Sequence, residues 1–162
     1  MIFGMSLVTY TLVHVAISLV AILAGFIVVI GMLDAKRMNA WTGLFLATTV
    51  ATSVTGFGFP VDHLLPSQIV GGISLVVLAI AIAARYGLHL AGAARWIYVV
   101  GALMALYLNV FVLVVQSFLK VPALKTLAPT QSEPPFQAAQ AVMLLLFIVL
   151  GIFTVRKFRN PT

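Results

Sequence analysis

The chain lacks cysteine and is short of charge. It has no Cys among its 162 residues, which excludes disulfide bonds, thiolate nucleophiles and cysteine-held zinc or iron–sulfur centres. Only 7% of the residues are charged, whereas soluble globular domains carry about 25%. Nine basic and three acidic side chains cannot cover the surface of a soluble globule when 63% of the residues are apolar. We therefore expect the chain to use lipid as its solvent.

Acidic side chains are the scarcest charged groups. Asp34, Asp62 and Glu133 all fall between the long apolar stretches and not within them. Ion-coupled carriers normally need a carboxylate inside a span or unwound helices at the membrane midplane, and neither is evident. The HExxH, GxSxG and P-loop patterns of hydrolases and nucleotide-binding enzymes are also missing. We therefore expect a non-enzymatic protein.

Long apolar runs dominate what remains. A helix needs about 20 mostly apolar residues to cross a bilayer, and each run of about that length ends at charge, proline or glycine. We predict an all-α polytopic membrane protein, a bundle of five transmembrane helices in one domain over residues 1–162. The predicted spans are approximately residues 7–33, 41–59, 67–86, 95–119 and 137–155.

The basic residues predict the orientation. Seven of the nine Lys and Arg residues fall on one side of the predicted spans, and only Lys120 and Lys125 fall on the other. The positive-inside rule then places the N-terminus outside and the C-terminus in the cytoplasm of a bacterial inner (plasma) membrane. This asymmetry and anionic inner-leaflet lipid account for the net charge of +6. The expected partner is the lipid bilayer, and nucleic acid is excluded.

Polar side chains within the spans gather in the outer half of the predicted bundle. Each must find a partner inside the protein, and small-and-polar faces let membrane helices approach closely. We expect these faces to meet around a pocket open to the periplasm. Its predicted ligand-binding residues are His14, Ser18, Thr52, Thr55, Ser74, Asn109 and Gln116.

Each of these residues also has a plainer interpretation. Thr and Ser hydroxyls within spans usually bond to their own helix, four residues back, and Asn109 is typical of a clasp between helices. His14 is the only readily titrating side chain placed well within a span. It could ligate haem together with His63, or flank a quinone, since two His form a sound axial pair. Apart from these two histidines we predict no metal ligands.

Three functions are compatible with this pattern. The favoured hypothesis is a non-catalytic accessory protein or a bundle that binds lipid or a small apolar ligand, without a cofactor. The alternatives are a haem- or quinone-binding redox subunit using His14, and a passive channel or exporter for a small solute. A homo-oligomer or a membrane-complex partner would use the small-residue face of Ser67, Gly71 and Ser74, or that of Ala79 and Ala83.

Three segments carry a resemblance that extends over nearly the whole chain. Residues 48–60 (TTVATSVTGFGFP), 62–67 (DHLLPS) and 128–136 (APTQSEPPF) resemble those of a group of small hypothetical multi-pass inner-membrane proteins of Gram-negative bacteria. The resemblance implies an inner-membrane location. It implies no activity and carries over no catalytic residue.

Overall fold

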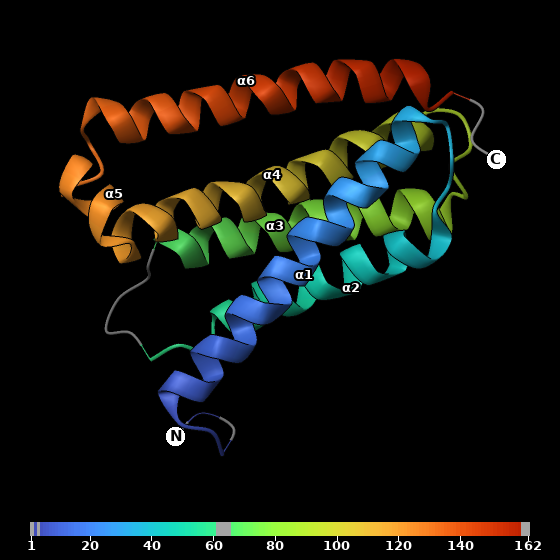
Figure 1. Ribbon diagram of the computed structural model, residues 1–162. Helices are drawn as coiled ribbons and strands as arrows, with labels where there is room; N and C mark the ends of the chain where they lie inside the picture. Colours follow the sequence, from blue (N-terminus) through green and yellow to red (C-terminus); the bar gives the residue numbers. More distant parts are fainter. Residues whose placement is uncertain (1, 3, 61–65, 160–162) are drawn as a thin grey trace.

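The computed structural model describes residues 2, 4–60 and 66–159, and within these residues the regular structure is helical apart from one isolated bridge. The predicted all-α class is therefore confirmed. A short π-helix continues α3, and a short helix precedes α6. The elements, shown in Figure 1, are α1 (Leu7–Leu33), α2 (Asn39–Gly56), α3 (Pro66–Ile82), η1 (Ala83–Gly87), α4 (Ala94–Lys120), α5 (Pro122–Leu127) and α6 (Pro134–Lys157).

Four helices in the described part of the chain are long and apolar enough to cross a membrane. They are α1, α3 continued by η1, α4 and α6, and each matches one of the predicted spans. The predicted fifth span corresponds to α2, which ends at Gly56 and not at residue 59. Its six Thr and Ser residues, from Thr42 to Thr55, lower its mean hydropathy. Length and composition therefore support four membrane spans in the described residues and do not support α2 as a fifth.

The ends of α1 follow from local hydrogen bonding. The Ser6 hydroxyl accepts a hydrogen bond from the Thr9 backbone N–H at 3.1 Å, which caps the N-terminus. At the other end, the N–H of Lys36 donates to the carbonyl of Gly31 at 2.8 Å. Ala35, just before it, has a left-handed backbone with φ of 56°. This Schellman-type ending usually has glycine at the left-handed position.

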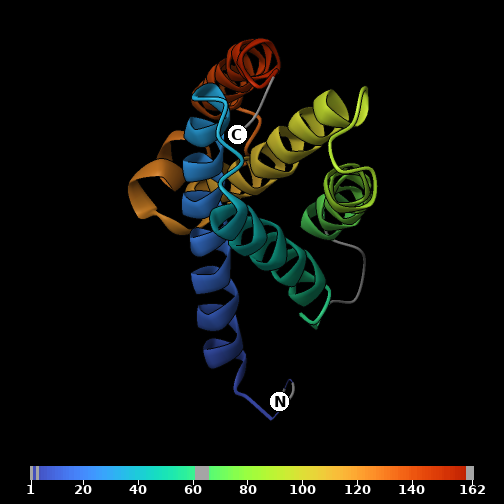
Figure 2. The ribbon, with the colours of Figure 1, turned by 90° about the vertical axis from the view of Figure 1, so that its right-hand side faces the viewer.

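The long helices run antiparallel to their neighbours in the sequence, and α4 lies at the centre with α1, α2, α3 and α6 around it. Helix α1 crosses this bundle obliquely (Figures 1 and 2), so its first half is largely exposed, although Tyr10 and His14 in it contact the end of α2. Val8 is 69% exposed, whereas Val28, further along the same helix, is 2% exposed. The packed core therefore surrounds the second half of α1.

Small residues set how closely these helices approach. A Cβ added to Gly25 of α1 would lie 2.6 Å from Leu106 Cδ1 of α4 and 2.9 Å from Phe45 Cε2 of α2. A Cβ at Gly101 of α4 would lie 3.0 Å from the Ala81 Cβ of α3. Close approach at small residues supplies the dispersion contacts that hold membrane helices together. These crossings are not the predicted meeting of small-and-polar faces, because Gly25 meets the bulky side chains of Leu106 and Phe45, and Gly101 and Ala81 lie outside the predicted faces.

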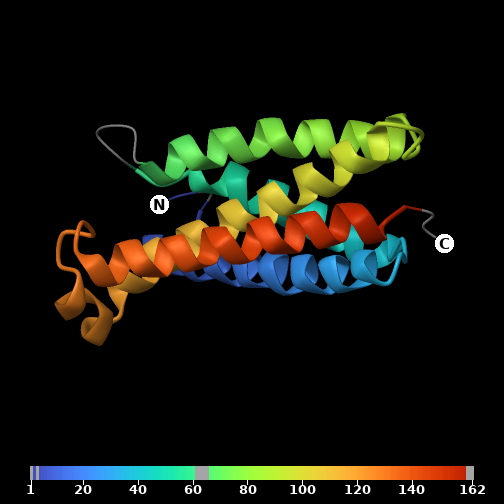
Figure 3. The same cartoon turned by 90° about the horizontal axis from the view of Figure 1, so that it is seen from above.

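The ends of five helical elements meet at one end of the bundle (Figure 3). The C-termini of α1, η1 and α6 lie there beside the N-termini of α2 and α4. We call this the basic end, because it gathers seven basic residues, and we call the other the opposite end. The basic residues are Lys36, Arg37, Arg85, Arg95, Arg156, Lys157 and Arg159.

Candidate functional site

Near the opposite end, α1 and the end of α2 share a polar cluster. The Tyr10 hydroxyl donates to the Thr55 carbonyl oxygen at 2.7 Å, and His14 Nδ1 lies 2.8 Å from Thr55 Oγ1. The Phe59 ring stands edge-on to both, with centroids 5.0 Å from Tyr10 and 5.2 Å from His14. Gly58 has no room for a side chain against the Tyr10 hydroxyl. The chain therefore folds closely over this cluster, which we call the Tyr10–His14–Thr55 cluster.

Hydrogen-bond accounting assigns the proton on His14. The Thr55 hydroxyl has one proton and directs it to the Ala51 carbonyl oxygen at 2.7 Å. With that proton on the Ala51 carbonyl oxygen, Thr55 Oγ1 accepts from His14 Nδ1–H, and this tautomer is the one that satisfies both hydrogen bonds at once. The neutral ring keeps its lone pair on Nε2. In this arrangement His14 acts as a link between α1 and α2.

The seven predicted ligand-binding residues divide into separate groups. His14 and Thr55 are brought together, and Ser18 donates to the His14 carbonyl oxygen at 2.7 Å. Asn109 is 3.4 Å from Thr49 Oγ1, a residue outside the predicted set. Thr52 and Ser74 bury hydroxyls that find no hydrogen-bond partner in the described residues. Gln116 is exposed on α4.

Three of the six Thr and Ser hydroxyls along α2 bond to the backbone of their own helix. Thr48 donates to Leu44 at 2.7 Å and Thr49 to Phe45 at 2.7 Å, in each case to the carbonyl four residues back. Thr55 does the same with Ala51. These bonds satisfy the hydroxyl protons locally, as the plainer interpretation expects. The hydroxyl face of α2 therefore serves packing within the chain.

The described residues include no cluster of three or more His, Asp or Glu side chains that could hold a metal ion. The second predicted haem ligand, His63, lies outside the described residues, so the pairing of His14 with His63 stays a prediction. His14 itself contacts Thr55 and Phe59. What the structure places around His14 is a hydrogen-bonding and aromatic environment.

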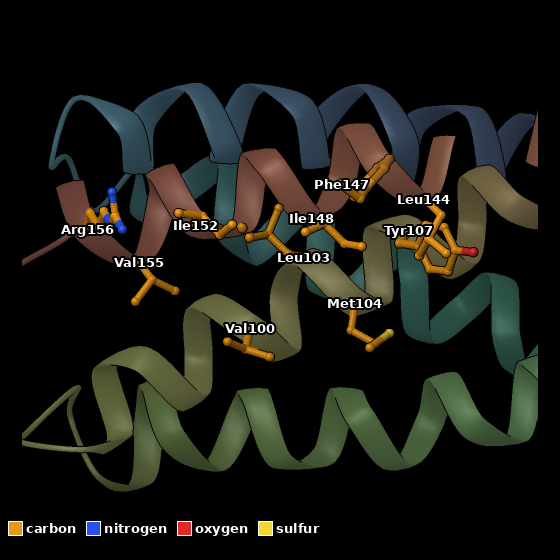
Figure 4. Close-up of a pocket in the computed structure, with 11 residues that line it drawn as sticks. Val100, Leu103, Met104, Tyr107, Leu144, Phe147, Ile148, Ile152, Val155 and Arg156 are labelled. Carbon is orange, nitrogen blue, oxygen red and sulfur yellow. The ribbon is translucent and has the colours of Figure 1, made fainter. Parts of the chain in front are cut away.

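A cavity lies elsewhere, in a groove between α4 and α6. Its volume is about 540 Å³, within the usual range of ligand pockets, about 300–1,000 Å³. Apart from Arg156 and the Tyr107 hydroxyl, the lining is apolar. Figure 4 shows Arg156 at one end of this groove and Tyr107 with Leu144 at the other. The lining residues are Val100, Leu103, Met104, Tyr107, Leu144, Phe147, Ile148, Gly151, Ile152, Val155 and Arg156.

None of the seven predicted residues lines this α4–α6 groove. Sequence reasoning missed it because it searched for polar groups, whereas the groove consists of apolar side chains beside a weakly packed helix. Only 11% of the apolar window of α6 is buried. A signal was present in Gly151, which leaves a gap in an otherwise bulky apolar run, followed by Arg156.

One of the two predicted oligomer faces is used within the chain. Ser74 is 2% exposed, and a Cβ at Gly71 would lie 3.6 Å from the Ser53 carbonyl oxygen of α2. Helix α2 therefore covers Ser74 of this face, whereas Ser67 and Gly71 are half-buried, and use of the face by a second copy stays a prediction. Ala79 and Ala83, which form the other predicted face, remain exposed.

Comparisons of the chain with protein-family models, with curated proteins and with solved structures find no match. The resemblance to small inner-membrane proteins of Gram-negative bacteria therefore stays a prediction.

Proposed function

We propose that this chain is an integral inner-membrane protein that crosses the bilayer five times and binds a phospholipid in the α4–α6 groove. It acts without catalysis, with its N-terminus outside and its C-terminus in the cytoplasm. The observation that carries the lipid-binding function is the groove, which joins an apolar lining to a terminal cation. The apolar lining suits an acyl chain, and the terminal cation suits the phosphate of its headgroup.

Two features support the five-span topology. Helix α2 has 18 residues and rises about 27 Å at ~1.5 Å per residue, close to the ~30 Å hydrocarbon core of a bilayer. It lies between α1 and α3, and the hydroxyls of Thr42, Thr48, Thr49 and Thr55 donate to backbone carbonyl oxygens of the chain, so these four groups need no partner in lipid. The basic end then faces the cytoplasm by the positive-inside rule.

The length of the groove favours a lipid over a compact molecule. From Leu144 to Arg156 the lining follows α6 for about 18 Å, at ~1.5 Å per residue. One leaflet occupies half of the ~30 Å hydrocarbon core, so the groove has the height of one leaflet. It lies in the half of the bundle nearer the basic end and would hold a lipid of the cytoplasmic leaflet.

Arg156 supplies the polar end of the site. It lines the groove in the last turn of α6, where a long cationic side chain can reach the headgroup layer. A guanidinium pairs well with phosphate through parallel N–H donors. The bound lipid would therefore place its chain against Leu103 and Ile148 and its phosphate beside Arg156.

The alternatives have less support. A haem or quinone site would need a cavity at His14, whereas His14 lines neither the α4–α6 groove nor the smaller cavity described at the basic end. A channel would need hydroxyls free to line a path, whereas those of Thr48, Thr49 and Thr55 bond to their own helix.

Filling the groove tests the proposal. A Cβ at Gly151 would lie 3.9 Å from Leu103 Cδ1, so Gly151→Leu extends into the groove without displacing backbone. We expect native mass spectrometry of gently extracted wild-type protein to show one retained phospholipid, and Gly151→Leu to lose it. Gly43→Leu is the matched control, because Gly43 of α2 faces open space. Equal lipid retention by the two variants would contradict the proposal.

A further inference from the structure

Arg85 is a buried cation with no carboxylate partner in the described residues. It is 6% exposed, and its Nη2 donates to the Arg37 carbonyl oxygen at 2.8 Å and to Asn39 Oδ1 at 2.7 Å. Both acceptors are uncharged. The ion pair that the described residues contain joins Lys36 to Asp34 at the exposed surface. The charge of Arg85 is therefore balanced by nothing that the described chain supplies.

The same guanidinium has an unused donor. Its Nη1 is buried and has no hydrogen-bond partner among the described residues. A buried donor left unpaired costs about 1–3 kcal/mol, and more when the group is charged. Buried charges are normally paired or coordinated. An anion bound to Arg85 would both balance its charge and accept a hydrogen bond from Nη1.

The fold holds Arg85 in this position firmly. The residue sits in the π-helix η1, and π-helical segments occur frequently at functional sites. Its Cζ lies 4.9 Å from the Tyr98 ring centroid and 5.6 Å from that of Tyr86. Two aromatic faces and two hydrogen bonds therefore fix the guanidinium before any ligand arrives.

A small cavity opens beside it at the basic end. Its volume is about 190 Å³, below the ~300–1,000 Å³ of pockets for whole small molecules. It is several times the ~30 Å³ that a water molecule occupies in the liquid. The size fits one compact anionic group and not an entire nucleotide. The lining residues are Arg37, Asn39, Arg85, Tyr86, His89 and Leu90.

We propose that this basic-end cavity binds the phosphate group of an anionic lipid headgroup. Guanidinium groups suit phosphate geometry, and the cavity brings Arg37 and Arg85 together. Trp41, Tyr86 and Trp96 are 42%, 51% and 48% exposed at the same end, as expected for aromatic residues at a membrane interface. The inference rests on the proposed membrane position of this end, but not on occupancy of the α4–α6 groove.

Free phosphate offers the same chemistry, so the experiment has two arms on the full chain. In the first, the protein is reconstituted in phosphatidylcholine nanodiscs with and without phosphatidic acid, and retained lipid is counted by native mass spectrometry. In the second, inorganic phosphate is added to protein in detergent at constant ionic strength, and the shift in melting temperature is measured. Arg85→Met and Arg37→Gln are compared with wild type in both arms.

Lys157→Gln is the matched control, because it removes one charge from the same end and Lys157 lines neither cavity. Arg37→Gln keeps the proposal testable if Arg85→Met does not fold, since Arg85 uses only the backbone oxygen of Arg37. We expect each of the two cavity variants to bind phosphatidic acid about tenfold more weakly, from the loss of one charge-assisted hydrogen bond. Lys157→Gln should bind like wild type.

The outcomes separate the two sources and the two lipid sites. Loss of phosphatidic acid in the cavity variants alone supports a headgroup site, whereas a phosphate-induced stabilisation lost in the same variants assigns the cavity to the free anion. Equal binding by wild type, Arg37→Gln and Arg85→Met in both arms would overturn the inference. Gly151→Leu should leave this site intact, so failure of the groove proposal and failure of this one are distinguishable.

Discussion

The Tyr10–His14–Thr55 cluster at the opposite end and the buried Arg85 at the basic end satisfy their hydrogen bonds differently. At the opposite end, the Tyr10–His14–Thr55 cluster directs its hydrogen bonds within the chain and carries no fixed charge. At the basic end, Arg85 is buried with a fixed charge and a donor that lacks a partner in the described residues. A polar cluster that is satisfied internally joins helices, whereas one left unsatisfied indicates a ligand. Polarity alone is therefore a weak guide to a membrane binding site.

Replacing Arg85 is the strongest way to test this comparison. Arg85→Met removes two charge-assisted hydrogen bonds and the aromatic contacts of the guanidinium. It also removes a cation whose burial is costly. We expect a net loss of about 2–3 kcal/mol of stability, measured by thermal or denaturant unfolding in detergent. Because Lys157 is exposed, Lys157→Gln should stay within about 0.5 kcal/mol of wild type. If Arg85→Met left the free energy of unfolding unchanged, the hydrogen bonds of Arg85 would not be stabilising the contact between the helix ends.

Two tyrosines allow a matched comparison of the two ends, because Tyr→Phe removes a hydroxyl group at Tyr10 in the opposite end and at Tyr98 in the basic end. Tyr10→Phe deletes a hydroxyl that donates to Thr55 at 2.7 Å and should cost about 1 kcal/mol. Tyr98→Phe deletes a buried hydroxyl that makes no hydrogen bond in the described part of the chain, and should be neutral or slightly stabilising. Unfolding midpoints of the two variants under identical conditions check the order. The reverse order would mean that the opposite end is not the better satisfied one.

The corner between α1 and α2 offers a smaller, stabilising change at the basic end. Ala35 has φ of 56°, a left-handed conformation that disfavours residues with a Cβ. Ala35→Gly removes this strain but also frees the unfolded chain, so we expect a net gain of about 0.5–1 kcal/mol. Gly43→Ala is the complementary control, since an Ala in the interior of α2 with open space around it should also stabilise. A loss of stability in Ala35→Gly would show that the left-handed backbone of Ala35 does not destabilise the folded chain.

The sequence predicted the helices well because apolar length and helix-ending residues are local properties. The first span, residues 7–33, matches α1 (Leu7–Leu33), and α4 (Ala94–Lys120) extends the predicted residues 95–119 by one residue at each end. Helix α5 (Pro122–Leu127) was not predicted, because it has only six residues, begins at a proline and has no long apolar run.

The candidate sites were harder to predict, for physical reasons. Residues such as His14 and Thr55 are polar and share one depth, but whether they line a cavity depends on how two helices cross. Their crossing is close enough for a direct hydrogen bond. The basic-end cavity depends on η1 burying Arg85 between two aromatic rings, which a count of loop charges cannot show. The packing of the helices, and not the composition of the sequence, therefore determines whether each of these two sites forms a cavity.

The smallest expected effect is a pH dependence at the opposite end, where Glu133 precedes α6. Its carboxylate accepts hydrogen bonds from the Thr130 hydroxyl at 2.9 Å and the backbone N–H of Ser132 at 3.1 Å. Desolvation alone would raise the pKa of Glu133, but these hydrogen bonds together hold it below its ordinary value of 4.5. Because the folded state favours the ionised form, the carboxylate stabilises the fold above that value and loses its effect as the pH falls through the lowered pKa.

Unfolding midpoints of wild type and Glu133→Gln, measured from about pH 6 to about pH 3, check this expectation. Wild type should be slightly more stable than the variant at the upper limit, and the difference should vanish at the lower one. The effect is small because the group is exposed to solvent and its charge is screened. A constant difference across the range would mean that Glu133 orders the turn before α6 through its shape and not through its charge. The ionisation of Glu133 would then make no contribution to the stability of the fold.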